Sequence, residues 1–483
     1  MRTIPLVGLL LLSSSLSAPL VEPLAAQTRS LTATDSALVG RVLLAEDRRD
    51  AADPVLAEAA RSTDARIRTI AWRARARIAD PTFAARDSLP PLPAPPTWPE
   101  PAWRLRLRAL ASQKSNCAAL RTALTDSAWA VRLQAVDDVG ATCASDDAIA
   151  QTLRAWVDVL PADASSRKAG GVSWHAAAHS LVTLARVWPV DARPRLAKLA
   201  THAQWEVRMY AARAAAALTD SAMLRTLARD RNDDVRDAAI AALGKLTKHA
   251  DDQLFLDALN ASGAQVVRAA AVALTGSPRT DVKAAASAAF DRWVAKNNAS
   301  SHDVRAALLA AAGRPITDDK PPAIHVELPP RAIALALGAD VRLRVNMAPS
   351  SGGGSFVVHL RGDIAPMMAA RVLELARSGY YNGLTWHRVE ADFVIQGGSP
   401  GANEYAGYSQ ALRDELGNVP HVRGTIGMST RGHDTGDAQW FVNLRDNPRL
   451  GRDYTVFAEV VDGIDVVDGI LEGDAIESIK EIT

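Results

Sequence analysis

Near the C-terminus, one arginine and two glutamines lie at short intervals among aromatic and aliphatic residues. Arg388 belongs to the segment 386–389 (Trp-His-Arg-Val), Gln396 to the segment 393–398 (Phe-Val-Ile-Gln-Gly-Gly), and Gln439 precedes a Trp-Phe pair. An arginine side chain is a permanent cation that donates hydrogen bonds and accepts none. Such a fixed cation could stabilise an atom that becomes basic only during a reaction. That chemistry requires no metal, nucleotide or covalent intermediate.

The order and spacing of a larger set of residues resemble the active face of the cyclophilins, the peptidyl-prolyl isomerases. Taken alone, an arginine in a strand or a phenylalanine would be uninformative, because buried phenylalanines are usually core residues. Seven matching residues in the same order and at similar spacing are far less easily explained by chance. They are Arg388, Phe393, Gln396, Met428, Gln439, Phe441 and Leu450. The resemblance begins near Asp340 and runs to the C-terminus. It implies an eight-stranded antiparallel β-barrel capped by two helices.

The resemblance also implies a role for each matching residue. Arg388 matches the family's catalytic arginine, and Gln396 and Gln439 match the glutamines that contact the substrate backbone and orient that arginine. The implied reaction is rotation about an X–Pro bond, whose barrier is about 18–20 kcal/mol because rotation breaks amide resonance. In the twisted state the proline nitrogen becomes basic and would accept a hydrogen bond from Arg388. The residues that match substrate-binding positions are Phe393, Val394, Met428, Ser429, Thr430, Phe441, Leu450 and Tyr454.

Several positions depart from the family pattern. Val394 stands where many members have methionine, and Arg449 stands where cyclosporin-sensitive members have tryptophan. The segments 399–415 and 431–437 do not follow the family sequence. By the resemblance, the second segment lies near the pocket that binds the residues before proline. Drug sensitivity and sequence preference therefore cannot be carried over from the family.

Secondary-structure signals in residues 338–483 fit a barrel that would position these side chains. Proline at 366 suits a first helical turn, and three glycines at 352–354 suit a hairpin turn. Within these bounds we expect strands at 340–345, 355–360, 384–389, 393–396, 425–429, 439–443 and 456–460, and helices at 366–378 and 464–472. Residues 324–328, in the segment before the barrel, also alternate as a strand does.

Residues 30–315 repeat a pattern of aspartate or a small polar residue, Val/Ile-Arg, and alanines at helical spacing. Examples are Ile67-Arg68, Val131-Arg132, Val207-Arg208, Val235-Arg236, Val267-Arg268 and Val304-Arg305. Later copies recur roughly every 28 to 37 residues, a period typical of solenoids. The pattern resembles HEAT repeats and predicts an all-α solenoid, in which each arginine would reach a carboxylate of an adjacent repeat. A proline-rich break at 89–101 predicts a loop or a surface strap, and 316–337 predicts a linker.

The first residues predict export. Residues 1–26 contain the basic residue Arg2, then a short apolar run, then an alanine-rich segment that could form the cleavage site. This is the pattern of a Sec-type signal peptide. We expect cleavage after Ala26, with a site near Ser17 as the alternative. Elsewhere no apolar run is long enough to predict a membrane span. The mature protein is expected to be soluble and periplasmic or secreted, and the Ala/Arg-rich composition is typical of bacteria.

Cys117 and Cys143 lie about one repeat apart. In an oxidising compartment they could form a disulfide across adjacent repeats, or they could remain buried thiols. His175 and His179 are four residues apart and could share a helix face, but no third ligand is evident, so we expect no metal site. We expect no cofactor.

These observations predict an exported peptidyl-prolyl isomerase that assists the folding of other exported proteins. Its substrates would be proline-containing polypeptides, and the helical array would hold a client or a protein partner along its concave face. The alternative is a non-catalytic scaffold whose repeats bind protein and whose barrel only docks proline segments. A formal net charge of +1 gives no attraction to nucleic acid.

Overall fold

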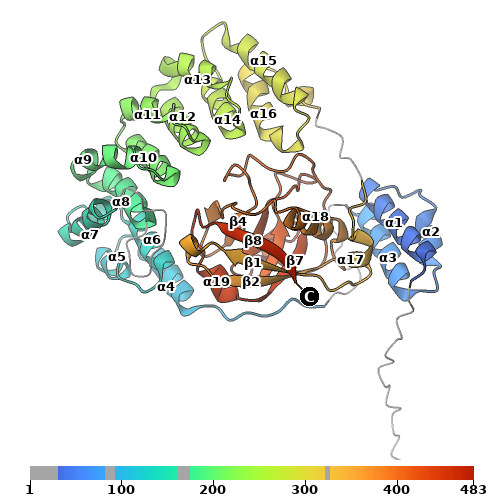
Figure 1. The fold of residues 1–483 in the computed structure, drawn as a ribbon. Coiled ribbons are helices and arrows are strands. Elements are labelled where there is room, and N and C mark those ends of the chain that lie inside the picture. The colour runs from blue at the N-terminus through green and yellow to red at the C-terminus, as the bar shows by residue number, and fades with distance from the viewer. Residues whose placement is uncertain (1–30, 82–92, 161–173, 321–326, 483) are drawn as a thin grey trace, which may run out of the picture.

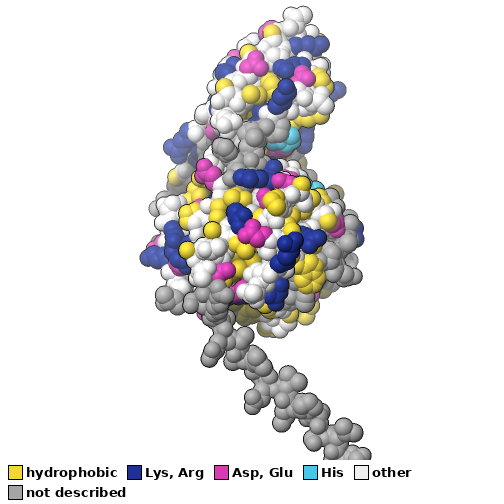
Figure 2. Space-filling view, turned by 90° about the vertical axis from the view of Figure 1, so that its right-hand side faces the viewer, with side chains coloured by type: hydrophobic (Ala, Val, Ile, Leu, Met, Phe, Trp, Pro, Cys, Tyr) yellow, Lys and Arg dark blue, Asp and Glu magenta, His cyan; other side chains and the backbone are white. Residues whose placement is uncertain are grey.

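The computed structural model describes residues 31–81, 93–160, 174–320 and 327–482. A bundle of three helices, a curved array of helices and a β-barrel follow one another along the chain (Figure 1). Within these ranges no helix is both long and apolar enough to cross a membrane. On the face that carries the N-terminal bundle, hydrophobic, basic and acidic side chains are mixed (Figure 2). That mixture fits a chain with little net charge.

The N-terminal bundle consists of α1 (Ala33–Arg48), α2 (Val55–Ala60) and α3 (Ala65–Ala79). The side chain of Asp64 accepts a hydrogen bond from the backbone N–H of Arg66 and so caps α3. The apolar face of α3, which includes Ile67 and Ile70, belongs to the same hydrophobic core as the barrel. The sequence instead predicts this bundle as part of one repeat domain over 30–315 that is interrupted at 89–101. The repeat pattern specifies an apolar helix face but does not specify which surface covers it.

The helical array has a separate core that runs from Leu110 to Ala312. Fully buried alanines such as Ala177, Ala211 and Ala270 allow neighbouring helices to approach closely. Successive helices pair and stack into an arc over the barrel (Figure 1). The helices are α4 (Ala102–Ala111), α5 (Cys117–Ala123), α6 (Trp129–Asp138), α7 (Asp147–Asp158), α8 (Trp174–Val187), α9 (Pro189–Ala200), α10 (Trp205–Ala217), α11 (Ser221–Leu227), α12 (Asp233–Thr247), α13 (Asp252–Ala258), α14 (Ala264–Leu274), α15 (Val282–Ala295) and α16 (His302–Ala312).

The repeated arginines stabilise the turns of the array. Arg208 donates to the carbonyl oxygen of His202, in the loop before its own helix, and forms an ion pair with Asp230 at 2.8 Å. Asp230 precedes the next repeat, so here the expected contact between repeats is present. Arg305 likewise donates to the carbonyl oxygen of Asn298. Cys117 and Cys143 are joined as a disulfide that ties the start of α5 to the turn Ala141–Cys143.

Eight strands form one antiparallel sheet in the order β3-β4-β6-β5-β7-β2-β1-β8. A bridge between Thr385, before β3, and Ala475, before β8, links the two ends of this order and curls the sheet into a barrel. The final strand was not predicted from the sequence. The strands are β1 (Arg342–Met347), β2 (Ser355–Leu360), β3 (Arg388–Val389), β4 (Val394–Gly397), β5 (Thr425–Met428), β6 (Trp440–Asn443), β7 (Val456–Asp462) and β8 (Ile476–Ile482).

The barrel also includes α17 (Ala332–Ala336), α18 (Pro366–Arg377) and α19 (Ile464–Asp468). The expected linker 316–337 therefore contains a short helix, and Leu335 of α17 is fully buried in the barrel core. Of the strand expected at 324–328, residues 324–326 lie outside the described residues, and 327–328 are not in a strand. Short 3-10 turns occur at Lys248–Asp251, Ala299–Ser301, Ile316–Asp318, Pro349–Ser351 and Pro448–Leu450.

The proline-rich segment before the array lies across the barrel. Residues 89–92 of this break are outside the described residues, and the described part runs beneath the sheet in Figure 1. The indole N–H of Trp98 donates to the carbonyl oxygen of Val460 at 3.2 Å. The guanidinium of Arg423 donates to the carbonyl oxygen of Pro99 at 3.2 Å. Of the two predicted possibilities, a loop or a strap, the strap is present.

The concave side of the array contacts the barrel of the same chain. On α8, His175 Nε2 lies 2.6 Å from the carbonyl oxygen of Glu472. On α10, the hydroxyl of Tyr210 donates to the Glu472 carboxylate at 2.7 Å, and His179 Nε2 lies 3.0 Å from that hydroxyl. These contacts use the two histidines considered as metal ligands. They also cover part of the surface that was expected to face a client.

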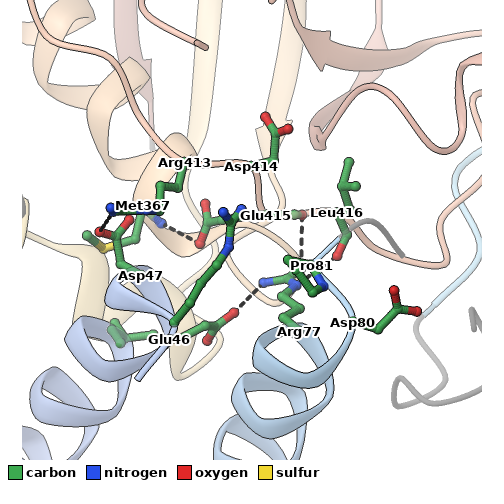
Figure 3. A pocket seen from close by; sticks show the side chains of 12 residues that line it. Glu46, Asp47, Arg77, Asp80, Pro81, Met367, Arg413, Asp414, Glu415 and Leu416 are labelled. Carbon is green, nitrogen blue, oxygen red and sulfur yellow. Dashed lines mark hydrogen bonds and ion pairs between the residues drawn. The ribbon is translucent and has the colours of Figure 1, made fainter. Parts of the chain in front are cut away.

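A buried charge cluster holds the N-terminal bundle against the barrel (Figure 3). The carboxylate of Glu46 accepts hydrogen bonds from Arg73 and Arg77, and Arg77 also donates to the carbonyl oxygen of Leu416. Burial acts to raise the pKa of Glu46, but the two arginines outweigh it and hold that pKa below its usual value. The neighbouring cavity has a volume of about 20 Å³, close to the space of one water molecule.

Candidate active site

The pairing of three neighbouring strands places the predicted arginine, glutamine and phenylalanine in one row. Arg388 of β3 lies directly opposite Gln396 of β4, and Gln396 lies opposite Phe441 of β6. Directly opposed residues in an antiparallel sheet project from the same face. The row therefore places a cation, an amide and an aromatic ring side by side on the barrel surface.

A hydrogen-bond chain connects the three predicted polar residues. Arg388 Nη1 donates to Gln396 Oε1 at 3.2 Å, and Gln396 Nε2 donates to Gln439 Oε1 at 3.2 Å. Gln439 Nε2 continues the chain to the carbonyl oxygen of Ala406 at 2.9 Å. Gln396 Nε2 also lies 3.0 Å from the hydroxyl of Ser429. Both glutamines are at least 95% buried. The hydrogen-bond chain therefore fixes the position of Arg388, whose side chain is 37% exposed.

An apolar cluster that is separate from the barrel core lies next to the arginine. Val394, Phe441 and Leu450 are buried together, and the half-buried side chains of Phe393 and Tyr454 pack against them. The rings of Phe441 and Tyr454 meet edge to face, with centroids 5.5 Å apart. These residues, with Arg388, Gln396, Ser429 and Thr430, line a cavity of about 320 Å³. A cavity of this size can accept a proline ring together with the flanking backbone.

One predicted substrate-binding residue does not line this cavity. The side chain of Met428 is fully buried in the barrel core. Alternation along β5 explains the difference, because Gly427 pairs with Phe441 on the cavity side and Met428 therefore points to the other face. A Cβ atom at Gly427 would lie 2.4 Å from the Phe441 ring, so this glycine makes room for the pocket wall.

Two glutamates that were not predicted flank the arginine. Glu390 accepts hydrogen bonds from Nε and Nη2 of Arg388, and the Glu404 carboxylate lies 3.4 Å from Arg388 Nη1. Both carboxylate side chains are about half exposed, at 49% and 48%. Glu390 was detectable from the sequence, because residues two apart in a strand share a face. Glu404 lies on a loop, where no such periodicity exists.

The array holds the loop that carries Glu404. Asn403 donates a hydrogen bond to Asp234 of α12 at 2.9 Å, and the guanidinium of Arg268 of α14 lies 4.2 Å from the centroid of the Tyr405 ring. Asp303 of α16 is 3.5 Å from Arg431, which lines the same cavity. Helices distant in sequence therefore support one rim of the cavity.

The histidine beside the arginine is unsuited to acid–base work at neutral pH. The pKa of His387 is lowered from 6.5 to about 4, chiefly by burial, with the charge of Arg388 acting in the same direction and a backbone hydrogen bond at Thr385 opposing them. The imidazole is therefore neutral at pH 7. Rotation about an amide bond requires no net proton transfer, so the site needs no titrating group in this position.

Comparison with known proteins identifies this barrel. A family model described as cyclophilin type peptidyl-prolyl cis-trans isomerase/CLD matches residues 344–482. A peptidyl-prolyl cis-trans isomerase of Helicobacter pylori (strain ATCC 700392 / 26695) is 38% identical over 130 residues, covering 26% of this chain and 80% of that protein. This chain belongs to the cyclophilin-type peptidyl-prolyl cis-trans isomerases. A second relative of this cyclophilin, peptidyl-prolyl cis-trans isomerase B of Bacillus subtilis, is 32% identical over 130 residues, covering 26% of this chain and 91% of that protein.

Two further comparisons concern the helical array and the solved structures. Residues 194–275 of the cyclophilin match a model described as HEAT repeats. Among solved structures, a cyclophilin type isomerase of Cryptosporidium parvum is 21% identical, covers 30% of this chain and 98% of that chain, and has a TM-score of 0.28. The two family models together show a cyclophilin-type isomerase domain fused to HEAT repeats, as the sequence predicted.

Proposed function

We propose that this cyclophilin accelerates X–Pro isomerisation in exported polypeptides and that Arg388 is its catalytic residue. The observation that carries the proposal is the position of Arg388, which borders the apolar cluster of Val394, Phe441 and Leu450 in one cavity. A proline ring held in that cluster would present its nitrogen to the guanidinium.

The arginine would act by stabilising the twisted amide. Rotation removes resonance from the C–N bond, so the proline nitrogen gains a lone pair that can accept a hydrogen bond. Arg388 uses Nε and Nη2 on Glu390 and Nη1 on Gln396, and a guanidinium has five N–H donors. Two N–H groups have no hydrogen bond to these two residues, one on Nη2 and one on Nη1, which also lies 3.4 Å from the Glu404 carboxylate. An interaction made only in the twisted state lowers the barrier rather than merely tightening ground-state binding.

The other predicted residues would bind and orient the peptide. The apolar cluster would hold the proline ring while the preceding carbonyl turns. Gln396 and Gln439 would keep Arg388 in place and contact the peptide backbone, and Ser429 and Thr430 line the same cavity. Met428 has no direct role in this proposal, because its side chain lies in the core.

An isomerisation assay on a short X–Pro peptide tests the catalytic proposal. Wild type should accelerate cis-trans exchange, and Arg388→Ala should lose activity by about 10²-fold or more, as when one transition-state donor is removed elsewhere. Arg342→Ala, which removes a half-exposed arginine on β1, is the matched control and should retain activity. Equal activity of Arg388→Ala and wild type would refute the proposal. A folded wild type without activity would favour a binding scaffold.

Export is the second part of the proposal. Its support is the signal-like sequence of residues 1–26, which lie outside the described residues, and the disulfide between Cys117 and Cys143. Disulfides persist mainly outside the cytosol. The test is fractionation of a bacterium that expresses the full chain, with N-terminal sequencing of the product. We expect a product beginning at Gln27 in the periplasm or medium, whereas a cytosolic product that retains Met1 would refute export.

A further inference from the structure

A second cavity lies between the array and the barrel, next to the active site. α4, α6 and α8 form one side of it, and the loops after β3 and α19 form the other (Figure 1). Its volume is about 330 Å³, within the range of specific ligand sites. Its apolar wall includes Trp103, Leu107 and Leu133 of the array and Phe393, Leu444 and Leu471 of the barrel. We refer to it as the array groove.

The array groove borders the active-site cavity. Phe393 lines both spaces, and Glu390, which pairs with Arg388, lines the groove. A polypeptide whose proline occupies the cluster of Val394, Phe441 and Leu450 would therefore pass Phe393 and enter the groove. The shared lining residue Phe393 distinguishes the groove from an apolar cavity elsewhere on the surface.

The groove lies on the side of the residues that follow proline. It shares Phe393 with the active-site cavity but is not lined by Ser429, Thr430 or Arg431. By the resemblance given above, the segment that begins at Arg431 lies near the residues that precede proline. The chain leaving in the opposite direction passes Phe393 and so meets Trp103 and Leu133.

The charges that line the groove restrict its occupant. Five carboxylates line it, from Asp137, Glu390, Asp392, Asp468 and Glu472, together with His175 and His179. Asp392 and Asp468 are already neutralised by arginines from both sides of the interface. The side chain of Asp137, by contrast, is 48% exposed and its carboxylate faces His179. An acidic client segment would be repelled here, whereas an apolar segment with a nearby basic residue would be complementary.

We propose that the array groove binds the client segment that follows the isomerised proline, and that it favours apolar and basic side chains over acidic ones. The inference rests on the proposed function, because it takes the client proline to sit beside Arg388. It assigns the HEAT array a direct part in substrate binding through helices α4, α6 and α8. A barrel alone would lack Trp103, Leu107 and Leu133 and would have only half of this site.

The test compares kcat/KM on a short X–Pro peptide with the values on two longer peptides. One is extended after proline by about six residues containing leucine and lysine, and the other carries the same extension before proline. For wild type we expect the first extension to raise kcat/KM about tenfold, the effect of one good anchor contact. The second extension should leave it near the short-peptide value. Replacing leucine and lysine with glutamate should remove the gain.

Trp103→Ala and Trp72→Ala form a matched pair of variants. Trp103 lines the groove, whereas Trp72 is a half-exposed tryptophan on α3, outside the groove lining. The ratio of long-peptide to short-peptide kcat/KM should fall toward one in Trp103→Ala and stay near the wild-type ratio in Trp72→Ala. Should Trp103→Ala fail to fold, Ala130→Trp supplies the same test by filling the groove, and circular dichroism verifies the fold of each variant.

Three results would overturn the groove proposal. They are an equal kcat/KM on short and C-terminally extended peptides, a gain only for the N-terminal extension, and an unchanged long-to-short ratio when Trp103 is removed or the groove is filled. Each can occur while wild type still isomerises the short peptide, which leaves the catalytic proposal standing. Failure on the short peptide with a folded wild type would instead refute the catalytic proposal.

Discussion

The guanidinium of Arg104, in the first helix of the array, donates a hydrogen bond from Nε to the carbonyl oxygen of Ala391 at 2.9 Å. Ala391 lies between Arg388 and Phe393, on the loop that joins β3 to β4. The same guanidinium donates to the carbonyl oxygen of Leu444 and to Asp468, each at 2.9 Å, and the Arg104 side chain is fully buried. One array residue therefore holds the loop that connects Arg388 of β3 to the pocket residue Phe393.

Arg104→Ala should destabilise the protein and loosen the active-site loop. The substitution leaves the carbonyl oxygen of Ala391 without this donor and removes one of the two arginines that neutralise Asp468. Breaking such a buried interaction costs about 3 kcal/mol. We expect that loss in urea unfolding, together with faster amide hydrogen exchange in residues 390–393. Arg106→Ala is the control, because Arg106 is on the same helix but half exposed, and should change both measurements little. Similar losses in the two variants would show that burial of Arg104 is not the cause.

Glu390→Gln should increase turnover of uncharged short peptides. Glu390 binds two of the donor groups of Arg388, and a neutral amide would hold the guanidinium less firmly while keeping a hydrogen-bond acceptor. Because more positive charge is then available to the proline nitrogen, we expect kcat/KM to rise by a few fold, about 1 kcal/mol or less. In an Arg388→Ala background the same change should have no effect, since the coupling requires both residues. A decrease with Arg388 present would mean that Glu390 mainly orients the arginine.

The sequence predicted the positions of the central site residues better than their surroundings. Arg388, Gln396 and Phe441 were identified by their resemblance to the family pattern, and the structure places them in one row. Met428 was misplaced because resemblance gives a position along the strand, whereas the side-chain face follows from its pairing with Trp440. Glu404 was missed because its position depends on contacts between a loop and the array, which are remote in sequence.

The architecture was predictable to a similar degree. Helical periodicity and the repeat interval predicted an array, and the structure contains one with its own core from Leu110 to Ala312. The same periodicity occurs in α3, yet its residues Ile67 and Ile70 pack in the barrel core. An amphipathic pattern reports that a face is buried, and only the three-dimensional arrangement decides what covers it.

Removal of the disulfide should weaken the first part of the array. Cys117 and Cys143 close a loop with a sequence separation of 26, for which chain entropy predicts roughly 3–4 kcal/mol of stabilisation. Cys117→Ala should lower the urea midpoint of the array by a corresponding amount. Dithiothreitol should lower the midpoint of wild type but leave Cys117→Ala unchanged, which controls for general effects of the reductant. Insensitivity of wild type to complete reduction would show that the bridge adds no stability.

Stability of the contact between the N-terminal bundle and the barrel should fall as the pH rises from about 4.5 to about 7. Glu415 is fully buried and accepts hydrogen bonds from the backbone N–H groups of Met367 and Met368. Burial raises its pKa from 4.5 to about 7, although the charge of Arg77 acts to lower it. In this window the folded protein binds a proton that the unfolded chain has released. Raising the pH therefore favours unfolding.

Glu415→Gln should remove much of this pH dependence. The amide oxygen can accept from only one of the Met367 and Met368 N–H groups, because the amide NH2 is a donor, but the side chain carries no charge. Between pH 4.5 and pH 8 the variant should therefore gain up to about 3 kcal/mol of stability relative to wild type. The difference due to charge should be smallest near pH 4.5, where the carboxyl group is protonated in the folded state and half protonated in the unfolded chain. Urea unfolding between pH 4.5 and 8 measures the difference. Glu477→Gln, at an exposed position on β8, is the matched control and should follow the wild-type curve. Parallel curves for Glu415→Gln and wild type would show that the buried carboxyl group does not titrate in this range.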